Sequence, residues 1–179
     1  MGKKLILTGT QGSGKSTILN YFKEKGYNVI TEVVRTLAKD GVKINEMGDV
    51  EGQRRIFNEY VKLFSENESY ISDRGLSDVT GYTFSHAIKE GDENGPLRKL
   101  ADEQFLAVEE FHKNNPDITV CYVPIEFPVV DDGVRSTNEE FRSEIDFLIK
   151  NILDCANIPY HTITGTVEER INKVKKLLE

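Results

Sequence analysis

The stretch GTQGSGKS, residues 9–16, decides the fold of this 179-residue chain. It matches the pattern G-x-x-x-x-G-K-[ST], in which glycines let the backbone curl so that several amide groups face one anion. An apolar run at residues 4–8 precedes it, and a helical pattern that begins at Lys15 follows it. The sequence therefore predicts a phosphate-binding loop between a buried strand and a helix, whose amino terminus adds to the attraction for phosphate.

The residues of this loop have separate expected roles. Lys15 is expected to reach the outer phosphates of a nucleoside triphosphate, and the hydroxyl of Ser16 to bind Mg²⁺. ATP and Mg²⁺ are therefore the expected cofactors. The remaining residues expected to contact the nucleotide belong to the loop and the first turn of its helix: Gly9, Gln11, Gly12, Ser13, Gly14 and Thr17.

Short apolar runs alternate with helical patterns along the rest of the chain. Further strands are expected at residues 27–30, 69–72, 117–123 and 160–163. Helices are expected at residues 15–25, 33–39, 50–64, 79–88, 97–113, 138–155 and 167–178. This alternation predicts an α/β fold of one domain, residues 1–179. The expected architecture is the three-layer P-loop NTPase fold: a five-stranded, mostly parallel sheet in the spatial order 2-3-1-4-5, with helices on both faces.

The amino-acid composition indicates which binding partners are disfavoured. The chain carries 30 acidic and 23 basic side chains, for a net charge of −7 and a sequence pI of about 5.1. Such a surface repels phosphate backbones on average, so binding to nucleic acid is disfavoured without being excluded. No apolar stretch approaches the ~18 residues of a membrane span, and we expect a cytoplasmic protein with no membrane partner. A homodimer is compatible with the sequence.

Charged residues follow the expected strands, where open parallel sheets bind ligands. Asp73 ends the third strand and is expected to hold Mg²⁺ or to accept the proton of an attacking hydroxyl. Glu32 follows the second strand and is the rival candidate for the base. Arg35 lies three residues later, on the same side if that segment is helical.

Two related classes of protein are disfavoured. Guanine-specific GTPases carry an Asn-Lys-x-Asp run after a strand, and no such run is present. An ordinary ATPase has a magnesium-binding acid at the end of a long apolar strand, whereas the fourth strand here runs on to Val123 and Pro124.

Together these residues resemble the nucleoside and nucleotide kinase branch of the P-loop proteins. More narrowly, the chain is similar to the family of small ATPase/kinase domains that includes bacterial ribosylnicotinamide kinase and phage-encoded nucleotide kinases. The resemblance rests on the phosphate loop and on four further pieces: TEVVR at 31–35, SDRG at 72–75, DDGVR followed by FRSEID within 131–146, and GTVEER at 165–170.

The resemblance implies an arginine-bearing lid around residues 124–142. Arg135 and Arg142 are seven residues apart, so they point the same way if the closed lid is helical, and both are expected to clamp the triphosphate. Gly165 is expected to lie against the adenine. The residues expected to hold the phosphate acceptor are Glu32, Arg35, Gln53 and Arg74.

The sequence thus predicts an ATP- and Mg²⁺-dependent kinase that acts on a nucleoside or (deoxy)nucleotide-like small molecule. One alternative is a P-loop ATPase that serves as a conformational switch or as a partner-regulated module. Another is a kinase that acts on a polynucleotide end or a modified base. The sequence leaves the identity of the acceptor open.

Overall fold

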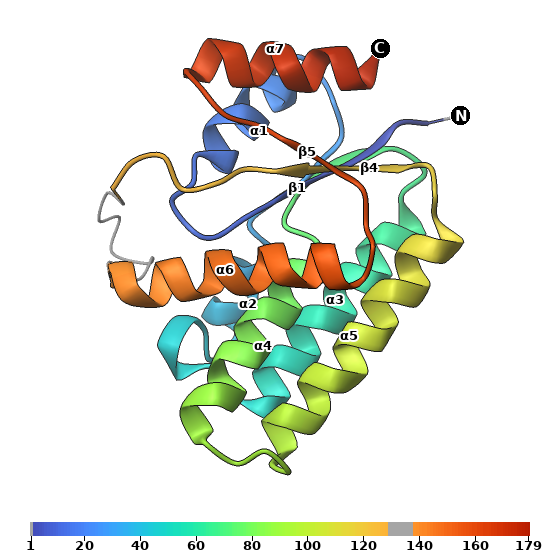
Figure 1. Cartoon of the computed structure of the whole chain (residues 1–179). Helices are drawn as coiled ribbons and strands as arrows, with labels where there is room; N and C mark the ends of the chain where they lie inside the picture. Colours follow the sequence, from blue (N-terminus) through green and yellow to red (C-terminus); the bar gives the residue numbers. More distant parts are fainter. Residues whose placement is uncertain (1, 129–137) are drawn as a thin grey trace.

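The computed structural model describes residues 2–128 and 138–179, and five strands run through them (Figure 1). All four pairings between neighbouring strands are parallel, and the order is β2-β3-β1-β4-β5, which confirms the predicted sheet. The strands are β1 (Lys4–Thr8), β2 (Val29–Ile30), β3 (Tyr70–Asp73), β4 (Ile118–Tyr122) and β5 (Tyr160–Thr162).

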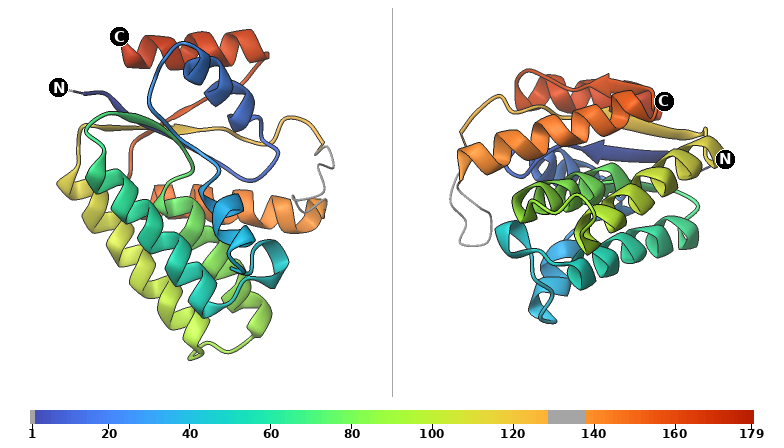
Figure 2. Two further views of the ribbon diagram at one scale, coloured as in Figure 1. Left: turned by 180° about the vertical axis from the view of Figure 1, so that it is seen from behind. Right: turned by 60° about the horizontal axis from the view of Figure 1, so that its bottom comes forward.

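Helices cover both faces of this sheet. Figure 1 shows α1 and α7 on one face and the other helices on the opposite face, and Figure 2 shows α3, α4 and α5 extending together away from the sheet. A short 3₁₀ turn, η1 (Asn45–Met47), was not predicted. The helices are α1 (Lys15–Glu24), α2 (Val33–Lys39), α3 (Val50–Glu66), α4 (Leu76–Glu90), α5 (Pro96–Asn114), α6 (Glu139–Cys155) and α7 (Val167–Leu178).

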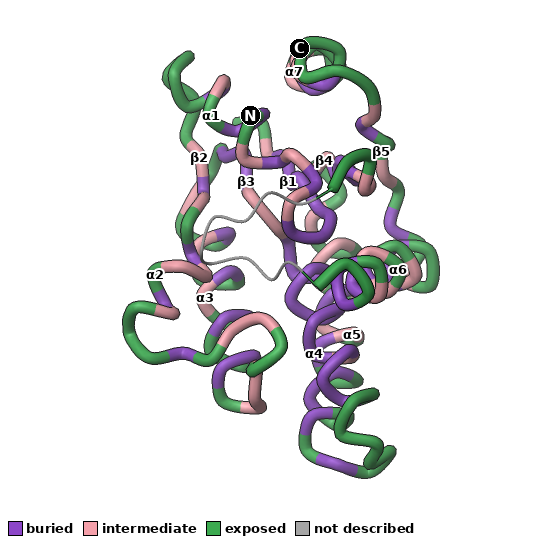
Figure 3. The backbone as a smooth tube through the Cα atoms, turned by 90° about the vertical axis from the view of Figure 1, so that its left-hand side faces the viewer, coloured by how far each residue is buried: buried purple, intermediate pink, exposed green. Residues whose placement is uncertain are grey.

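The side chains of β1 divide the core into two parts because successive residues of a strand point to opposite faces. Leu5 and Leu7 are fully buried and pack in the cluster that includes Phe22 of α1 and Val174 of α7. Ile6 packs in the larger cluster on the other face. In Figure 3 the buried residues gather in the central strands and along α4. The first strand, and with it the phosphate loop, is therefore fixed on both sides.

Many boundaries differ from the sequence prediction, mostly by one or two residues, and two of the differences bear on the site. Helix α4 begins at Leu76, three residues earlier than expected, because the carboxylate of Asp78 accepts a hydrogen bond from the amide of Gly75 at 2.7 Å and caps the helix. Strand β2 is limited to Val29–Ile30, the two residues that pair with β3. Within the described residues no helix is long and apolar enough to cross a bilayer.

Candidate active site

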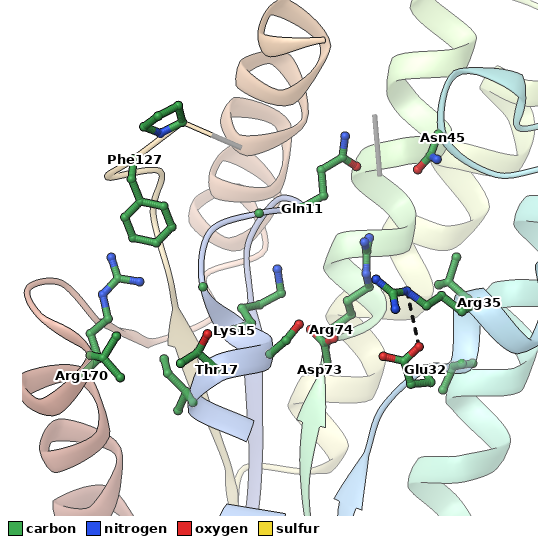
Figure 4. Close-up of a pocket in the computed structure, with 18 of the residues that line it drawn as sticks. Gln11, Lys15, Thr17, Glu32, Arg35, Asn45, Asp73, Arg74, Phe127 and Arg170 are labelled. Carbon is green, nitrogen blue, oxygen red and sulfur yellow. Dashed lines mark ion pairs between the residues drawn. The ribbon is translucent and has the colours of Figure 1, made fainter. Parts of the chain in front are cut away.

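A cavity of about 460 Å³ lies at the carboxyl ends of the strands (Figure 4). One wall is the phosphate loop with the first turn of α1, and the facing wall is made by the segments after β2 and β3. Residues after β4 and β5 close the remaining side. Its polar lining includes Lys15, Ser16, Thr17, Glu32, Arg35, Asn45, Asp73, Arg74 and Arg170. The structure thus brings together groups that come from five separate parts of the sequence.

The phosphate loop has the curled backbone that its glycines allow. Gly9, Gly12 and Gly14 have φ values of 142°, 69° and 96°, in the region that favours glycine. A Cβ at Gly9 would lie 2.4 Å from the carbonyl oxygen of Val123. Glycine is therefore required at position 9 for two reasons: its backbone conformation, and the close approach of the carbonyl of Val123, which follows β4.

The side chain of Lys15 folds back across the loop. Its ammonium group donates hydrogen bonds to the carbonyl oxygens of Gly9 and Thr10, both at 2.7 Å. The side chain is almost fully buried, yet it lines the cavity together with Ser16 and Thr17. The ammonium is thus held at the place where a polyphosphate would meet the loop.

Asp78 is a buried part of this region that the sequence analysis missed. Its carboxylate accepts hydrogen bonds from the hydroxyl of Thr8 at 2.7 Å and from the amides of Gly9 at 2.9 Å and Gly75 at 2.7 Å. Burial raises the pKa of Asp78, and the nearby charge of Lys15 opposes that shift. The residue joins the start of the phosphate loop to the end of β3.

The two candidate bases both line the cavity. Glu32 has a left-handed backbone, with φ 61°, and its carboxylate pairs with Nε of Arg35 at 3.4 Å, as the dashed line in Figure 4 shows. Asp73 ends β3, and its backbone carbonyl accepts a hydrogen bond from the hydroxyl of Tyr60 at 3.0 Å. Oδ1 of Asp73 is buried and has no hydrogen-bond partner in the part of the chain that the structure describes.

Arg74 extends from a strained backbone into the same cavity. Its φ is 91°, which is uncommon for a residue other than glycine. The guanidinium lies 5.1 Å from the ring centre of Tyr82. Among residues 2–128 and 138–179 no carboxylate lies within ion-pair distance of it.

Gln53 is not brought into the main cavity. Its side chain is buried, and its Oε1 accepts a hydrogen bond from the hydroxyl of Thr83 at 3.3 Å. It lines a small adjoining cavity of about 20 Å³, which shares Asn45 and Arg74 with the main one. Contact between Gln53 and an acceptor therefore remains a prediction.

Of the two arginines expected in the lid, the structure describes only Arg142. Arg135 lies outside the described residues, as do residues 129–137 of the expected lid. Arg142 is fully buried, and its guanidinium donates to the backbone carbonyls of Gln11, Gly12 and Phe127 at 2.9–3.1 Å. It lies behind the phosphate loop and does not line the cavity. In this structure Nε and Nη2 of Arg142 bind backbone carbonyls and Nη1 binds the carboxylate of Glu139, so a contact between Arg142 and a triphosphate remains a prediction.

A second arginine that the sequence analysis did not single out lies at the cavity wall. The guanidinium of Arg170 donates to the carbonyl of Gly165 at 2.8 Å and lies 5.1 Å from the ring centre of Phe127. Gly165 has φ 102°, and its amide donates to the carboxylate of Glu126 at 2.9 Å. Gly165 thus lines the cavity together with Phe127 and Arg170, and its contact with a nucleotide remains a prediction.

The residues present fit a magnesium ion that is held mainly by phosphates. Within the described residues no three His, Cys, Asp or Glu side chains gather as a metal cluster. Ser16 and Asp73 both line the cavity, and Oδ1 of Asp73 is a buried oxygen without a hydrogen bond there. Mg²⁺ commonly takes one or two protein ligands and completes its octahedron with water and substrate phosphates.

Solved structures share this fold at low sequence identity. Deoxyadenosine kinase from M. mycoides is 17% identical, with 98% of this chain and 97% of that chain covered and a TM-score of 0.63. Thymidylate kinase from Candida albicans is 14% identical, with coverage of 99% and 91% and a TM-score of 0.57. A NadR protein in complex with NR is 13% identical, with a TM-score of 0.73, and this chain spans 50% of its length while 98% of this chain is covered.

Comparison with curated protein sequences gives no significant match. A family model described as an AAA domain matches residues 4–170, which is nearly the whole chain and includes the phosphate loop, Asp73, Arg142 and Arg170. The chain therefore belongs to this AAA domain family, and it has the fold of the P-loop nucleoside and nucleotide kinases.

Proposed function

We propose that the protein is a kinase that transfers the terminal phosphoryl group of ATP to a nucleoside or nucleotide. The observation that carries this proposal is that one cavity has a phosphate loop on one wall and two acids with two arginines on the facing wall. Glu32 and Arg35 form an ion pair there, and Asp73 and Arg74 are neighbours that do not pair with each other. A volume of about 460 Å³ is within the usual range for small-molecule sites. A hydrolase would need no such facing wall for a second substrate.

The proposed reaction breaks the bond between the γ-phosphorus and its bridging oxygen and forms a new bond to an oxygen of the acceptor. The loop amides and Lys15 hold the phosphates and offset the charge that moves to the departing ADP. Mg²⁺, when bound, neutralises charge on the β- and γ-phosphates. Asp73 orients the acceptor, and where the acceptor is a hydroxyl, Asp73 takes up its proton.

The facing wall favours an acceptor that carries negative charge. Arg74 has no carboxylate partner in the described part of the chain, whereas the charge of Arg35 is balanced by Glu32 at 3.4 Å. A guanidinium that lines the cavity and makes no direct ion pair with the described residues is well suited to a phosphate group. We therefore place nucleoside monophosphates ahead of nucleosides as acceptors.

The test is a panel of nucleosides and nucleoside monophosphates, each incubated with the protein, ATP and Mg²⁺ while ADP release and the phosphorylated product are measured. The proposal expects ADP release that depends on one acceptor or a small group of acceptors. ADP release at the same rate with every acceptor and with none would contradict a kinase and favour the partner-regulated ATPase. Product on a polynucleotide end alone would favour the other alternative.

A further inference from the structure

Three cationic side chains bind the backbone carbonyl oxygens of five consecutive residues of the phosphate loop. Two of the three side chains, Arg142 and Arg170, come from helices more than 120 residues away along the chain. The contacts are Lys15 Nζ with Gly9 and Thr10 at 2.7 Å, Arg142 Nε with Gln11 at 3.0 Å, Arg142 Nη2 with Gly12 at 3.1 Å, and Arg170 Nη1 with Ser13 at 2.7 Å.

Most of these residues have little access to water, and Gly12 is half-buried. Gln11 and Ser13 are buried, Arg142 is 0% exposed, and the side chain of Arg170 is 3% exposed. A buried carbonyl that loses its donor is destabilising, so each arginine supplies a bond that solvent does not replace. The arginines therefore fix the direction in which the peptide planes of the loop point.

The two arginines contribute little net charge to the site. Arg142 Nη1 pairs with Glu139 at 2.9 Å, and Arg170 pairs with Glu126. Each guanidinium is thus balanced by its own carboxylate, which weakens its field at the cavity. Each guanidinium, in contrast, is planar and rigid, so its N–H groups can donate to two or more separate acceptors in fixed directions.

The same arginines also bind the segment that follows β4. Arg142 donates to the carbonyl of Phe127 at 2.9 Å, and Arg170 lies against the ring of Phe127. A Cβ at Gly14 would lie 3.0 Å from both Arg170 Nη1 and Phe127 Cζ. The loop and this segment are therefore held as one rigid unit at the cavity wall.

We infer that Arg142 and Arg170 are positioning residues that hold the carbonyl groups of residues 11–13 away from the cavity, so that the loop amides face the phosphates. If either fork is lost, a peptide plane of the loop can turn and present a carbonyl oxygen to the polyanion, which repels it. This inference rests on the proposed binding of ATP at the loop. In this inference Arg142 orients the loop carbonyls, in place of the expected role of clamping the triphosphate.

The experiment compares Arg142→Met, Arg142→Lys and Arg170→Lys with the wild-type protein. The probe is the magnesium complex of a non-hydrolysable ATP analogue, and its affinity is measured by calorimetry. The lysine variants keep the buried charge and its carboxylate partner but lose the fork, so they remain informative where the methionine variant does not fold. Arg98→Met is the matched control, because Arg98 is a half-exposed arginine on α5 that pairs with Asp102.

We expect the Arg142 and Arg170 variants to bind the analogue about 10- to 100-fold more weakly, which corresponds to about 1.4–2.8 kcal/mol. We also expect faster hydrogen exchange confined to the amides of residues 9–16 in the ligand-free protein, and wild-type affinity in Arg98→Met.

Lysine variants that bind the analogue within about twofold of wild type would overturn the positioning role and leave the proposed phosphoryl transfer standing. A general rise in hydrogen exchange across the sheet would also overturn it, because that pattern indicates ordinary loss of stability. Failure of the wild-type protein to bind the analogue would contradict both this inference and the proposed function.

Discussion

The carboxylate of Asp78 accepts a hydrogen bond at 2.9 Å from the amide of Gly9, the first residue of the phosphate loop. The same carboxylate also binds the hydroxyl of Thr8 and the amide of Gly75. One buried acid therefore fixes the exit of β1 relative to the exit of β3, where the candidate base Asp73 lies. The distance between the phosphate loop and the facing wall of the cavity, which is made by the segments after β2 and β3, depends on this contact.

Replacing Asp78 with asparagine tests that relationship. The amide side chain presents one acceptor oxygen in place of two and sets an NH₂ group against at least one existing donor. We expect the free energy of unfolding to fall by about 1–3 kcal/mol, as for an unsatisfied buried group, and ATP to bind more weakly. Urea unfolding and calorimetry measure the two effects. Asp102→Asn on α5 is the exposed control, and equal losses in both variants would contradict a special role for Asp78.

Lys15→Ala removes the ammonium group that lines the cavity beside the loop. We expect turnover to fall by about 100-fold or more, the usual effect of losing a donor that stabilises transition-state charge. Steady-state ADP release in the presence of the best acceptor measures it. Lys25→Ala, at the end of α1 and outside the cavity, should leave turnover unchanged. Turnover within tenfold of wild type in Lys15→Ala would contradict the assigned role.

Asp73→Asn and Glu32→Gln decide between the two candidate bases. We expect Asp73→Asn to lower kcat by about 10²- to 10⁴-fold, the contribution of a general base, while the affinity for ATP stays within about twofold. Glu32→Gln should act mainly on the KM for the acceptor, because Glu32 is already paired with Arg35. A larger loss of kcat in Glu32→Gln than in Asp73→Asn would reverse the assignment.

Gly9→Ala and Gly26→Ala separate steric conflict from backbone strain. Both glycines have positive φ values, 142° and 84°, but only a Cβ at Gly9 would meet a backbone atom, the carbonyl oxygen of Val123. We expect Gly26→Ala to cost about 1–2 kcal/mol in the free energy of unfolding. Gly9→Ala should cost more and also weaken ATP binding. Thermal and urea unfolding give the comparison, and an equal cost at the two sites would contradict the close approach seen at Gly9.

His86 makes the stability depend on pH in the acidic range. Burial lowers its pKa to about 4, whereas the pKa of an unfolded histidine is about 6.5. The unfolded chain therefore binds more protons between these values, and the free energy of unfolding falls as the pH drops from about 6.5 to about 4. At ~1.4 kcal/mol for each pKa unit, His86 accounts for up to about 3 kcal/mol of this loss.

The measurement is urea unfolding at a series of pH values for His86→Gln and the wild-type protein. The variant should show a shallower acid slope, with a remainder from His112, whose pKa burial also lowers to about 4. His161→Gln, which changes an exposed histidine on β5, is the control. An unchanged slope in His86→Gln would contradict the prediction.

The sheet and the phosphate-loop wall of the cavity could be predicted because the sequence patterns that indicate them are local. The glycines of the loop, the apolar strand before it and the helix after it lie within 25 residues of one another. The helix bounds Val33–Lys39 and Val167–Leu178 were predicted as the structure has them, since a charged or polar residue precedes each apolar stripe. The alternation of strands and helices predicts a parallel sheet, whereas the strand order was expected from the P-loop fold that the phosphate loop indicates.

The buried arginines could not be assigned from the sequence in the same way, because their partners lie far away along the chain. Arg142 meets Gln11 across 131 residues, and Arg170 meets Ser13 across 157. A signal was nevertheless present. Arg142 lies on the same helical face as Ile145 and Ile149, and Arg170 lies four residues before the buried Val174. An arginine within an inward-facing stripe indicates a buried ionic contact, although the spacing does not say with what.

The positive φ of Arg74 has a consequence for how this chain varies. A residue held at φ 91° is strained by about 1–3 kcal/mol, and glycine would relieve that strain. Screening a library for heat resistance alone should therefore enrich glycine at position 74, while screening the same library for catalysis should retain arginine. Selection for thermal stability and selection for catalytic activity thus favour different residues at position 74.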